Sequence, residues 1–259
     1  MGSSQYQSIG QVVLPTTRIF VSTHYLQKYR NGALLLVLIS LLVACASLPP
    51  VPDQRPMTQN IVAMDSVLGK LTTAATLEHA PLNGIRVLDS GRDALLERAA
   101  LIEAAERSID AQYYIWNGDN SGRYLASRIY AAAERGVRVR LLLDDINVGD
   151  RDSNLATLAR HPNIEIRIYN PFATRGMGKA FNFLGEFARL NRRMHNKSFT
   201  VDGVVTILGG RNIGDEYFDA NPQLNFRDRD VVAIGPVVAS VGSMFDAFWN
   251  SELSRDVTE

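Results

Sequence analysis

The chain has 259 residues, of which 46% are hydrophobic and 21% are charged, proportions that are ordinary for a globular protein. Its 27 basic residues equal its 27 acidic residues, so the composition carries no bulk signature of nucleic-acid binding, although a local basic patch stays open. Cys45 is the single cysteine, which excludes an internal disulfide.

The first 56 residues are predicted to form a leader, a signal segment and a tether. Residues 1–31 are polar and show no clear period, so we expect no regular structure there. The apolar run Ala33–Ala44 follows Lys28 and Arg30, and its length suits a signal-peptide core better than a membrane span of about 20 residues. Four prolines between residues 49 and 56 then make a stiff tether.

The end of the apolar run, Leu42–Cys45, resembles a bacterial lipobox, in which the cysteine is lipidated and becomes the mature N-terminus. The resemblance implies that Cys45 is a lipid anchor and that the protein is held at a membrane of the bacterial cell envelope. Two acyl chains on such a cysteine give durable anchoring. The alternatives are a single anchor helix that is not cleaved and a buried helix with an incidental cysteine.

Residues 57–259 are predicted to form one α/β domain. Strands are expected at Gly84–Asp89, Ile109–Trp116, Val137–Leu143, Ile164–Tyr169, Val204–Leu208 and Phe226–Ile234, and helices at Met64–Leu82, Asp93–Arg107, Gly122–Arg135, Asn154–Arg160 and Val237–Trp249. The alternation of strands and helices predicts a mixed, largely parallel β-sheet that is flanked by helices on both faces.

Two segments before the last strands allow more than one interpretation. Asp144 and Asp145 follow a predicted strand, where carboxylates commonly form turns; a metal site is the disfavoured alternative. In Asn170–Asn191, the apolar residues form either core or a wall that faces acyl chains. Three arginines lie at the end of this segment and just after it, namely Arg189, Arg192 and Arg193. They either hold anionic headgroups or form a solvated basic turn.

The chemistry concentrates in Met194–Asn212. His195 and Lys197 are two residues apart, so in an extended segment both point to the same face. Asn212 has an amide that can donate to an oxyanion. An imidazole, an ammonium and an amide that converge on one point suit a phosphodiester, because its phosphoryl oxygens carry the charge. Gly209 and Gly210 would end the preceding strand and let the backbone approach a ligand.

This pattern resembles the H-x-K-x4-D-x6-G-[GS]-x-N motif of the phospholipase D superfamily. Every position is present, namely His195, Lys197, Asp202, Gly209, Gly210 and Asn212. The agreement of all positions outweighs the common alternative, a structural histidine on a strand. The surrounding segments are similar to bacterial cardiolipin synthases of the lipoprotein-like type, from about Met57 to Ser254; they are Asp110–Trp116, Gly136–Asp145, Leu190–Lys197, Gly209–Phe218 and Gly235–Val238.

The resemblance implies roles for individual residues and no metal or other cofactor. His195 would be either the nucleophile that forms a phosphohistidine or the acid that protonates the leaving alcohol. Lys197 and Asn212 would hold non-bridging oxygens, and Asp202 belongs to the catalytic motif, although local pairing suits it better. Asp228, with Asp230 as the fallback, would orient the imidazole. Substrate-binding positions are expected at Gly209, Gly210 and Arg193.

The chain carries one copy of the motif, since His195 alone among its four histidines is followed by x-Lys. In the superfamily two such motifs face each other, so a second half is expected from the same polypeptide or from a second copy. The resemblance implies phosphatidylglycerol as a substrate, phosphatidylethanolamine as a candidate second lipid, and cardiolipin as the product. The alternatives are a homodimeric phosphodiesterase acting on nucleic acid, which the balanced charge disfavours, and a catalytically silent lipid-binding half-domain.

Overall fold

The computed structural model describes residues 27, 29–34, 57–147, 152–172 and 187–257. The chain divides into two units, Met1–Cys45 and Ala46–Glu259. In the first unit, the described residues are helical, so the expectation of no regular structure is wrong at residues 27 and 29–31. The predictions for Cys45, for the signal core beyond residue 34, for the prolines up to residue 56 and for residues 173–186 lie outside the described residues.

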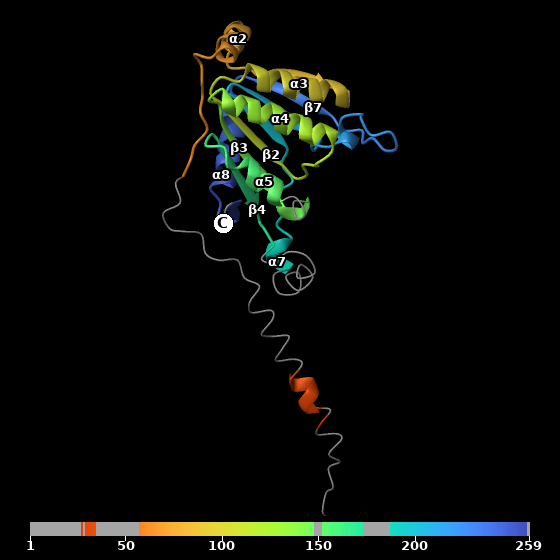
Figure 1. Cartoon of the computed structure of the whole chain (residues 1–259). Helices are drawn as coiled ribbons and strands as arrows, with labels where there is room; N and C mark the ends of the chain where they lie inside the picture. The colour runs from red at the N-terminus through yellow and green to blue at the C-terminus, as the bar shows by residue number, and fades with distance from the viewer. Residues whose placement is uncertain (1–26, 28, 35–56, 148–151, 173–186, 258–259) are drawn as a thin grey trace, which may run out of the picture. The chain divides into compact units, whose positions relative to one another are not determined.

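The second unit is built on one eight-stranded sheet with the strand order β1-β7-β6-β5-β2-β3-β4-β8 (Figure 1). The strands are β1 (Gly84–Leu88), β2 (Ser108–Tyr113), β3 (Arg138–Asp144), β4 (Ile164–Tyr169), β5 (Ser198–Val201), β6 (Val205–Gly209), β7 (Asp230–Ile234) and β8 (Ser254–Asp256). The mixed α/β class is confirmed, because β2, β3 and β4 pair in parallel through helical crossovers.

The balance of the pairings differs from the prediction of a largely parallel sheet. The five other pairings among the described strands are antiparallel. The antiparallel pairing of β5 with β6 has a local cause. Asp202 and Gly203 have φ angles of +53° and +65° and form a tight turn that reverses the chain between the two strands. The helix between β1 and β2 does not bring these two strands side by side, because β1 is the outermost strand of the sheet and pairs with β7.

Helices cover both faces of the sheet, as predicted (Figure 1). They are α2 (Val67–Thr76), α3 (Gly91–Ala104), α4 (Asn120–Glu134), α5 (Asp152–Leu158), α7 (Phe187–Leu190) and α8 (Val237–Trp249), with short 3₁₀ turns at Leu77–His79, Asp145–Asn147 and Asp215–Tyr217. Successive residues of a strand point to opposite faces. Accordingly Leu141 packs in the core beneath α3 and α4, and Leu142 packs with Phe245 and Trp249 of α8.

Most residues of the motif lie at one end of the central strands, and this end of the strands is called the sheet edge below. The pairings give β2, β3, β4 and β6 the same direction, and β5 and β7 the opposite one. The carboxyl ends of the first group therefore lie beside the amino ends of the second. Such an edge is where ligands commonly bind in α/β sheets.

Candidate active site

His195 lies just before β5, with its ring against Tyr114. The two ring centroids are 4.0 Å apart and the ring planes are tilted by 33°. Lys197 Nζ lies 5.4 Å from the centroid of the same tyrosine ring and donates to the backbone oxygen of His195 over 2.7 Å. The two motif side chains thus meet around one aromatic ring, which agrees with their two-residue spacing.

The electrostatics of this pair favour a neutral imidazole. His195 is exposed, and the limited desolvation of its ring, followed by the positive charge of Lys197, lowers its pKa below the ordinary value of 6.5. Burial also lowers the pKa of Lys197, while the carboxylate of Asp228 acts in the opposite direction. At neutral pH the imidazole therefore keeps a free lone pair next to a half-buried ammonium group.

Asn212 is buried and oriented by the segment that carries Tyr114. Its Oδ1 accepts the backbone N–H of Ile115 over 3.0 Å, which leaves the NH₂ group to donate. That side chain is hydrogen-bonded to the hydroxyl of Tyr217, which also interacts electrostatically with Asp228 and Tyr114. Burial raises the pKa of Tyr217, so this hydroxyl stays protonated at neutral pH. A contact of Asn212 with phosphoryl oxygens stays a prediction.

Gly209 and Gly210 allow the end of β6 to approach the chain that leads into β7. A Cβ on Gly209 would lie 2.0 Å from Asp230 Oδ1, and one on Gly210 would lie 2.7 Å from Asp228 Oδ1. The backbone N–H of Gly210 donates to the backbone oxygen of Arg229 over 3.0 Å. The close approach that requires these glycines is therefore to protein carboxylates, whereas the sequence predicted an approach to a ligand.

Asp228 and Asp230, the two candidates for orienting the imidazole, have different surroundings. Within the described residues, neither forms a hydrogen bond with His195. Asp230 is buried, accepts from Arg98 Nη2 over 2.9 Å and from the backbone N–H of Arg211 over 3.2 Å, and so is not available to the imidazole. Asp228 is half-buried near Lys197, and its orienting role stays a prediction.

The buried carboxylate of Asp230 belongs to a network that fixes the sheet edge. Arg98, which contacts it from α3, also donates from Nε to the hydroxyl of Tyr113 over 2.9 Å. Arg211 Nη1 lies 3.9 Å from Asp230 Oδ2 and donates to the backbone oxygen of Leu88 over 3.1 Å. The network therefore ties together the ends of β1, β2, β6 and β7 behind the motif.

Asp202 lies at the opposite end of β5 from His195, which corrects its place among the catalytic residues. Its side chain is buried and accepts the backbone N–H groups of Glu106, Arg107 and Ser108 at 2.8–3.3 Å. Its own backbone N–H donates to Ser108 over 2.8 Å. Asp202 therefore locks the β5–β6 turn onto the start of β2, the local pairing that suited it better from the sequence.

Arg193 binds protein groups, whereas one interpretation of the sequence placed it in a solvated basic turn. Its Nη1 donates to Asp144 Oδ1 over 3.0 Å, and its Nη2 donates to the backbone oxygen of Asn170. The other oxygen of Asp144 accepts the backbone N–H of Met194 over 2.8 Å. Arg193 is therefore engaged in positioning the segment that enters the motif, and its contact with substrate stays a prediction.

Asp144 and Asp145 both bind protein groups. Asp144 also accepts the backbone N–H of Ile146 over 2.9 Å, and Asp145 accepts that of Phe172 over 2.7 Å. In the part of the chain that the structure describes, no group of three or more histidine, cysteine or acidic side chains is placed to hold a metal ion. Over the same residues, no helix combines the length and the apolar character that crossing a bilayer requires.

Sequence reasoning did not identify three residues of the site. Tyr114 and Tyr217 lie around the motif residues, and Asp144 anchors the segment before them. Tyr114 lay in a predicted aromatic-rich strand and Asp144 at a predicted strand end, so position relative to the sheet edge was the available signal. Tyr217 had no such signal, because only the folded loop brings it to Asn212.

Comparison with known proteins gives consistent matches. Residues 99–249 match the protein family described as "Cardiolipin synthase, PLD-like domain". Over 172 residues, the chain is 53% identical to cardiolipin synthase C of Escherichia coli K12, which covers 66% of this chain and 36% of that protein. Over 209 residues, it is 37% identical to an uncharacterized protein of Helicobacter pylori 26695, covering 79% and 42%. Over 169 residues, it is 30% identical to the major cardiolipin synthase ClsA of Bacillus subtilis 168, covering 65% and 33%.

The chain thus spans only about a third to two fifths of the length of these relatives. The family match nevertheless takes in more than half of the chain, and it contains the whole stretch from His195 to Asn212. The same stretch meets around Tyr114 and Tyr217 at one edge of the sheet. The chain therefore belongs to the phospholipase D-like family of cardiolipin synthase domains.

Proposed function

We propose that the chain supplies one half of an active site that transfers a phosphatidyl group between phospholipids. The observation that carries this proposal is the placement of His195 and Lys197 around Tyr114 at the sheet edge. Family membership supports phosphodiester chemistry on lipids, since cardiolipin synthases are among the similar proteins. Phosphatidylglycerol is the proposed donor, with phosphatidylethanolamine as a candidate second substrate and cardiolipin as the product.

We propose His195 as the nucleophile: its ring lies beside Tyr114 and Lys197 at the site, and the direction of its pKa shift agrees with the neutral imidazole that attack on phosphorus requires. An imidazole nitrogen attacks phosphorus, and the phosphorus–oxygen bond to the leaving alcohol breaks. The histidine of a second motif gives a proton to that alcohol. The acceptor alcohol then attacks phosphorus, the nitrogen–phosphorus bond breaks, and the second histidine takes the proton of the acceptor hydroxyl.

Lys197 and Asn212 stabilise the charge that the phosphoryl oxygens carry in both steps. The ammonium of Lys197 lies next to His195, and a half-buried charge acts more strongly than one in bulk water. Tyr217 extends this set, because its protonated hydroxyl lies with Asn212 at the same edge. These residues complete one half of the site, and a second H-x-K motif in the same polypeptide or in a second copy completes the other.

The proposed location is a membrane of the bacterial cell envelope, with Cys45 as the lipid anchor. The support is the basic flank, the apolar run and the lipobox-like end of that run in the sequence. Mass spectrometry of the N-terminal peptide of the mature protein tests this. A diacylglyceryl group on Cys45 is expected, and an unmodified cysteine inside a longer N-terminal peptide would contradict the anchor.

The catalytic assignment is tested with the full-length gene product and phosphatidylglycerol that is labelled in its phosphate. Phosphohistidine survives alkali and is lost in acid, so an alkaline quench should trap label on the protein. His195→Ala is expected to abolish both the trapped label and cardiolipin formation. His79→Ala is the matched control, because His79 is exposed in the 3₁₀ turn Leu77–His79, outside the motif. Unchanged cardiolipin formation by His195→Ala, or cleavage of DNA in place of lipid, would overturn the proposal.

A further inference from the structure

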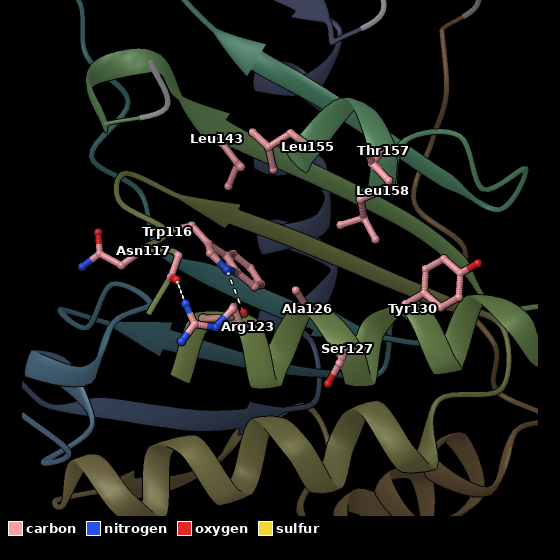
Figure 2. Close-up of a pocket in the computed structure, with 12 residues that line it drawn as sticks. Trp116, Asn117, Arg123, Ala126, Ser127, Tyr130, Leu143, Leu155, Thr157 and Leu158 are labelled. Atoms are coloured by element: carbon pink, nitrogen blue, oxygen red, sulfur yellow. Dashed lines mark hydrogen bonds between the residues drawn. The ribbon is translucent and has the colours of Figure 1, made fainter. Parts of the chain in front are cut away.

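An apolar cavity of about 470 Å³ lies between α4 and α5, over the sheet (Figure 2). Leu155 and Leu158 of α5 and Leu143 of β3 form one side, and Ala126 and Tyr130 of α4 form the other. Its volume is within the range of small-molecule sites, which are mostly apolar with a few placed polar groups. The remaining lining residues are Trp116, Asn117, Gly118, Gly122, Arg123, Ser127 and Thr157.

The segment Tyr114–Asn117 connects this cavity directly to the motif. The ring of Tyr114 packs at a tilt against His195, and the backbone N–H of Ile115 donates to Asn212 Oδ1. The next two residues, Trp116 and Asn117, line the cavity. An extended chain rises about 3.3 Å per residue, so Trp116 lies about 7 Å along the chain from Tyr114. The cavity therefore begins a short step from the proposed phosphodiester chemistry.

The wall at this end of the cavity is rigid. Trp116 Nε1 donates to the backbone oxygen of Gly122 over 3.2 Å, and its indole meets the Tyr113 ring edge-on with centroids 5.6 Å apart. The start of α4 packs against the same segment, since a Cβ on Gly122 would lie 1.8 Å from the backbone oxygen of Asn117. The indole is therefore held in place before any ligand arrives, which lowers the entropic cost of binding.

A polar space lies on the other side of the motif. A cleft of about 500 Å³ borders Asp228 and is lined mainly by charged and polar residues, among them Arg227 and Asn225. The motif is therefore flanked by a polar cleft and an apolar cavity. This arrangement suits an amphiphile whose phosphodiester lies at the junction of its polar and apolar parts.

We propose that the cavity lined by Trp116, Leu143, Leu155 and Leu158 binds an acyl chain of the phospholipid whose phosphodiester reacts at His195. The inference rests on the proposed function and adds the site that holds the apolar part of the substrate. Each methylene that enters an apolar cavity raises affinity about fourfold. Affinity is therefore expected to grow with the length of the acyl chain until the cavity is filled.

Trp116 provides a reporter of binding that does not depend on activity. The chain has two tryptophans, and Trp249 is the last residue of α8, buried on the opposite face of the sheet. In the Trp249→Phe variant, all tryptophan fluorescence comes from Trp116. The probe is a short-chain phosphatidylglycerol with one brominated acyl chain, used below its micelle-forming concentration. Bromine quenches tryptophan at contact, so saturable quenching that the unbrominated lipid reverses is expected.

A matched pair of substitutions on α4 tests the place of binding. Ala126→Phe puts a ring into the cavity, and Ala131→Phe makes the same change at an exposed position of the helix outside the lining. We expect at least a tenfold loss of lipid affinity in the first variant and an unchanged affinity in the second. Equal affinities in the two variants, or no quenching in either, would overturn the proposal.

Two further measurements separate this proposal from the proposed function. His195→Ala should abolish transfer and leave the quenching unchanged, so a failure of the catalytic assignment does not hide the result. If Trp249→Phe does not fold, Trp116→Phe in the otherwise unchanged chain must remove the quenching. Equal quenching by a brominated detergent of the same chain length would show a non-selective apolar cavity and would refute a phospholipid site.

Discussion

The buried carboxylate of Asp144 leads to a prediction about pH-dependent stability. Its oxygens accept Arg193 Nη1 and the backbone N–H groups of Met194 and Ile146. Burial nevertheless dominates and raises its pKa from 3.8 to about 6; Arg193 and the backbone donors oppose this effect, and the neighbouring charge of Asp145 adds to it. The folded protein therefore binds this proton more tightly than the unfolded chain does, and the contribution of Asp144 to stability falls as the pH rises.

The size of the effect follows from the two pKa values. The difference between 3.8 and about 6 corresponds to about 3 kcal/mol in full. Between pH 4 and pH 7, where most of this difference is lost, the free energy of unfolding should fall by about 2 kcal/mol through this group. Asp144→Asn removes the titration and keeps the shape. One of its donors then faces an N–H group, which shifts the stability of the variant by an amount that does not depend on pH.

The measurement is urea unfolding of the wild type and of Asp144→Asn at intervals from pH 4 to pH 7, followed by circular dichroism. Urea is preferred because guanidinium salts screen charges. Histidines titrate in both proteins, so their effect cancels in the difference. We expect the wild type to lose about 2 kcal/mol relative to the variant as the pH rises. A difference that rises with pH would mean that the ion pair with Arg193 outweighs burial, and it would refute the reasoning.

Three further predictions concern the motif. Asp202→Ala should destabilise the fold by about 2 kcal/mol, because it removes the acceptor of one buried and two partly buried backbone N–H groups. Urea unfolding measures this, and a loss below about 1 kcal/mol would contradict the locking role. Gly209→Ala should lower the melting temperature more than Gly210→Ala, since its Cβ would meet a buried carboxylate at 2.0 Å rather than a half-buried one at 2.7 Å; equal melting temperatures would contradict this. Lys197→Gln should raise the pKa of His195, because it removes a nearby positive charge; NMR titration of the ring measures this, and an unchanged pKa would show that the two charges do not interact.

The sequence predicted most elements that have a strong period of their own. The strand Ile164–Tyr169 and the helix Val237–Trp249 have the predicted bounds, because their apolar residues follow strand and helix periods throughout. The strand predicted from Phe226 begins only at Asp230. Every second residue of 226–229 is an arginine, a period of two that a strand also has. The backbone N–H of Phe226 nevertheless donates to the backbone oxygen of Glu216 in the 3₁₀ turn Asp215–Tyr217, and the strand pairing starts only at Asp230.

Other features depend on contacts that no local pattern encodes. The strand Ser254–Asp256 has three polar residues and exists because the edge of β4 pairs with it. The environment of Asp230 could not be predicted either, since Arg98 lies 132 residues earlier in the chain. Asp228 and Asp230 are two residues apart on one predicted strand, yet the fold buries one in an ion-pair network and leaves the other beside Lys197.

The spacing of the motif has a structural meaning that the fold makes plain. The four residues between Lys197 and Asp202 are Ser198–Val201, which are the whole of β5. His195 and Asp202 are therefore separated by a strand, roughly 20 Å when extended. The residues at one end of β5 face the proposed chemistry, and Asp202 at the other end fixes β5 against the start of β2. Because β2 ends immediately before Tyr114, the lock at the far end sets the register that places this ring against His195. The aspartate of the motif thus acts on the site through the strand, without touching the reacting atoms.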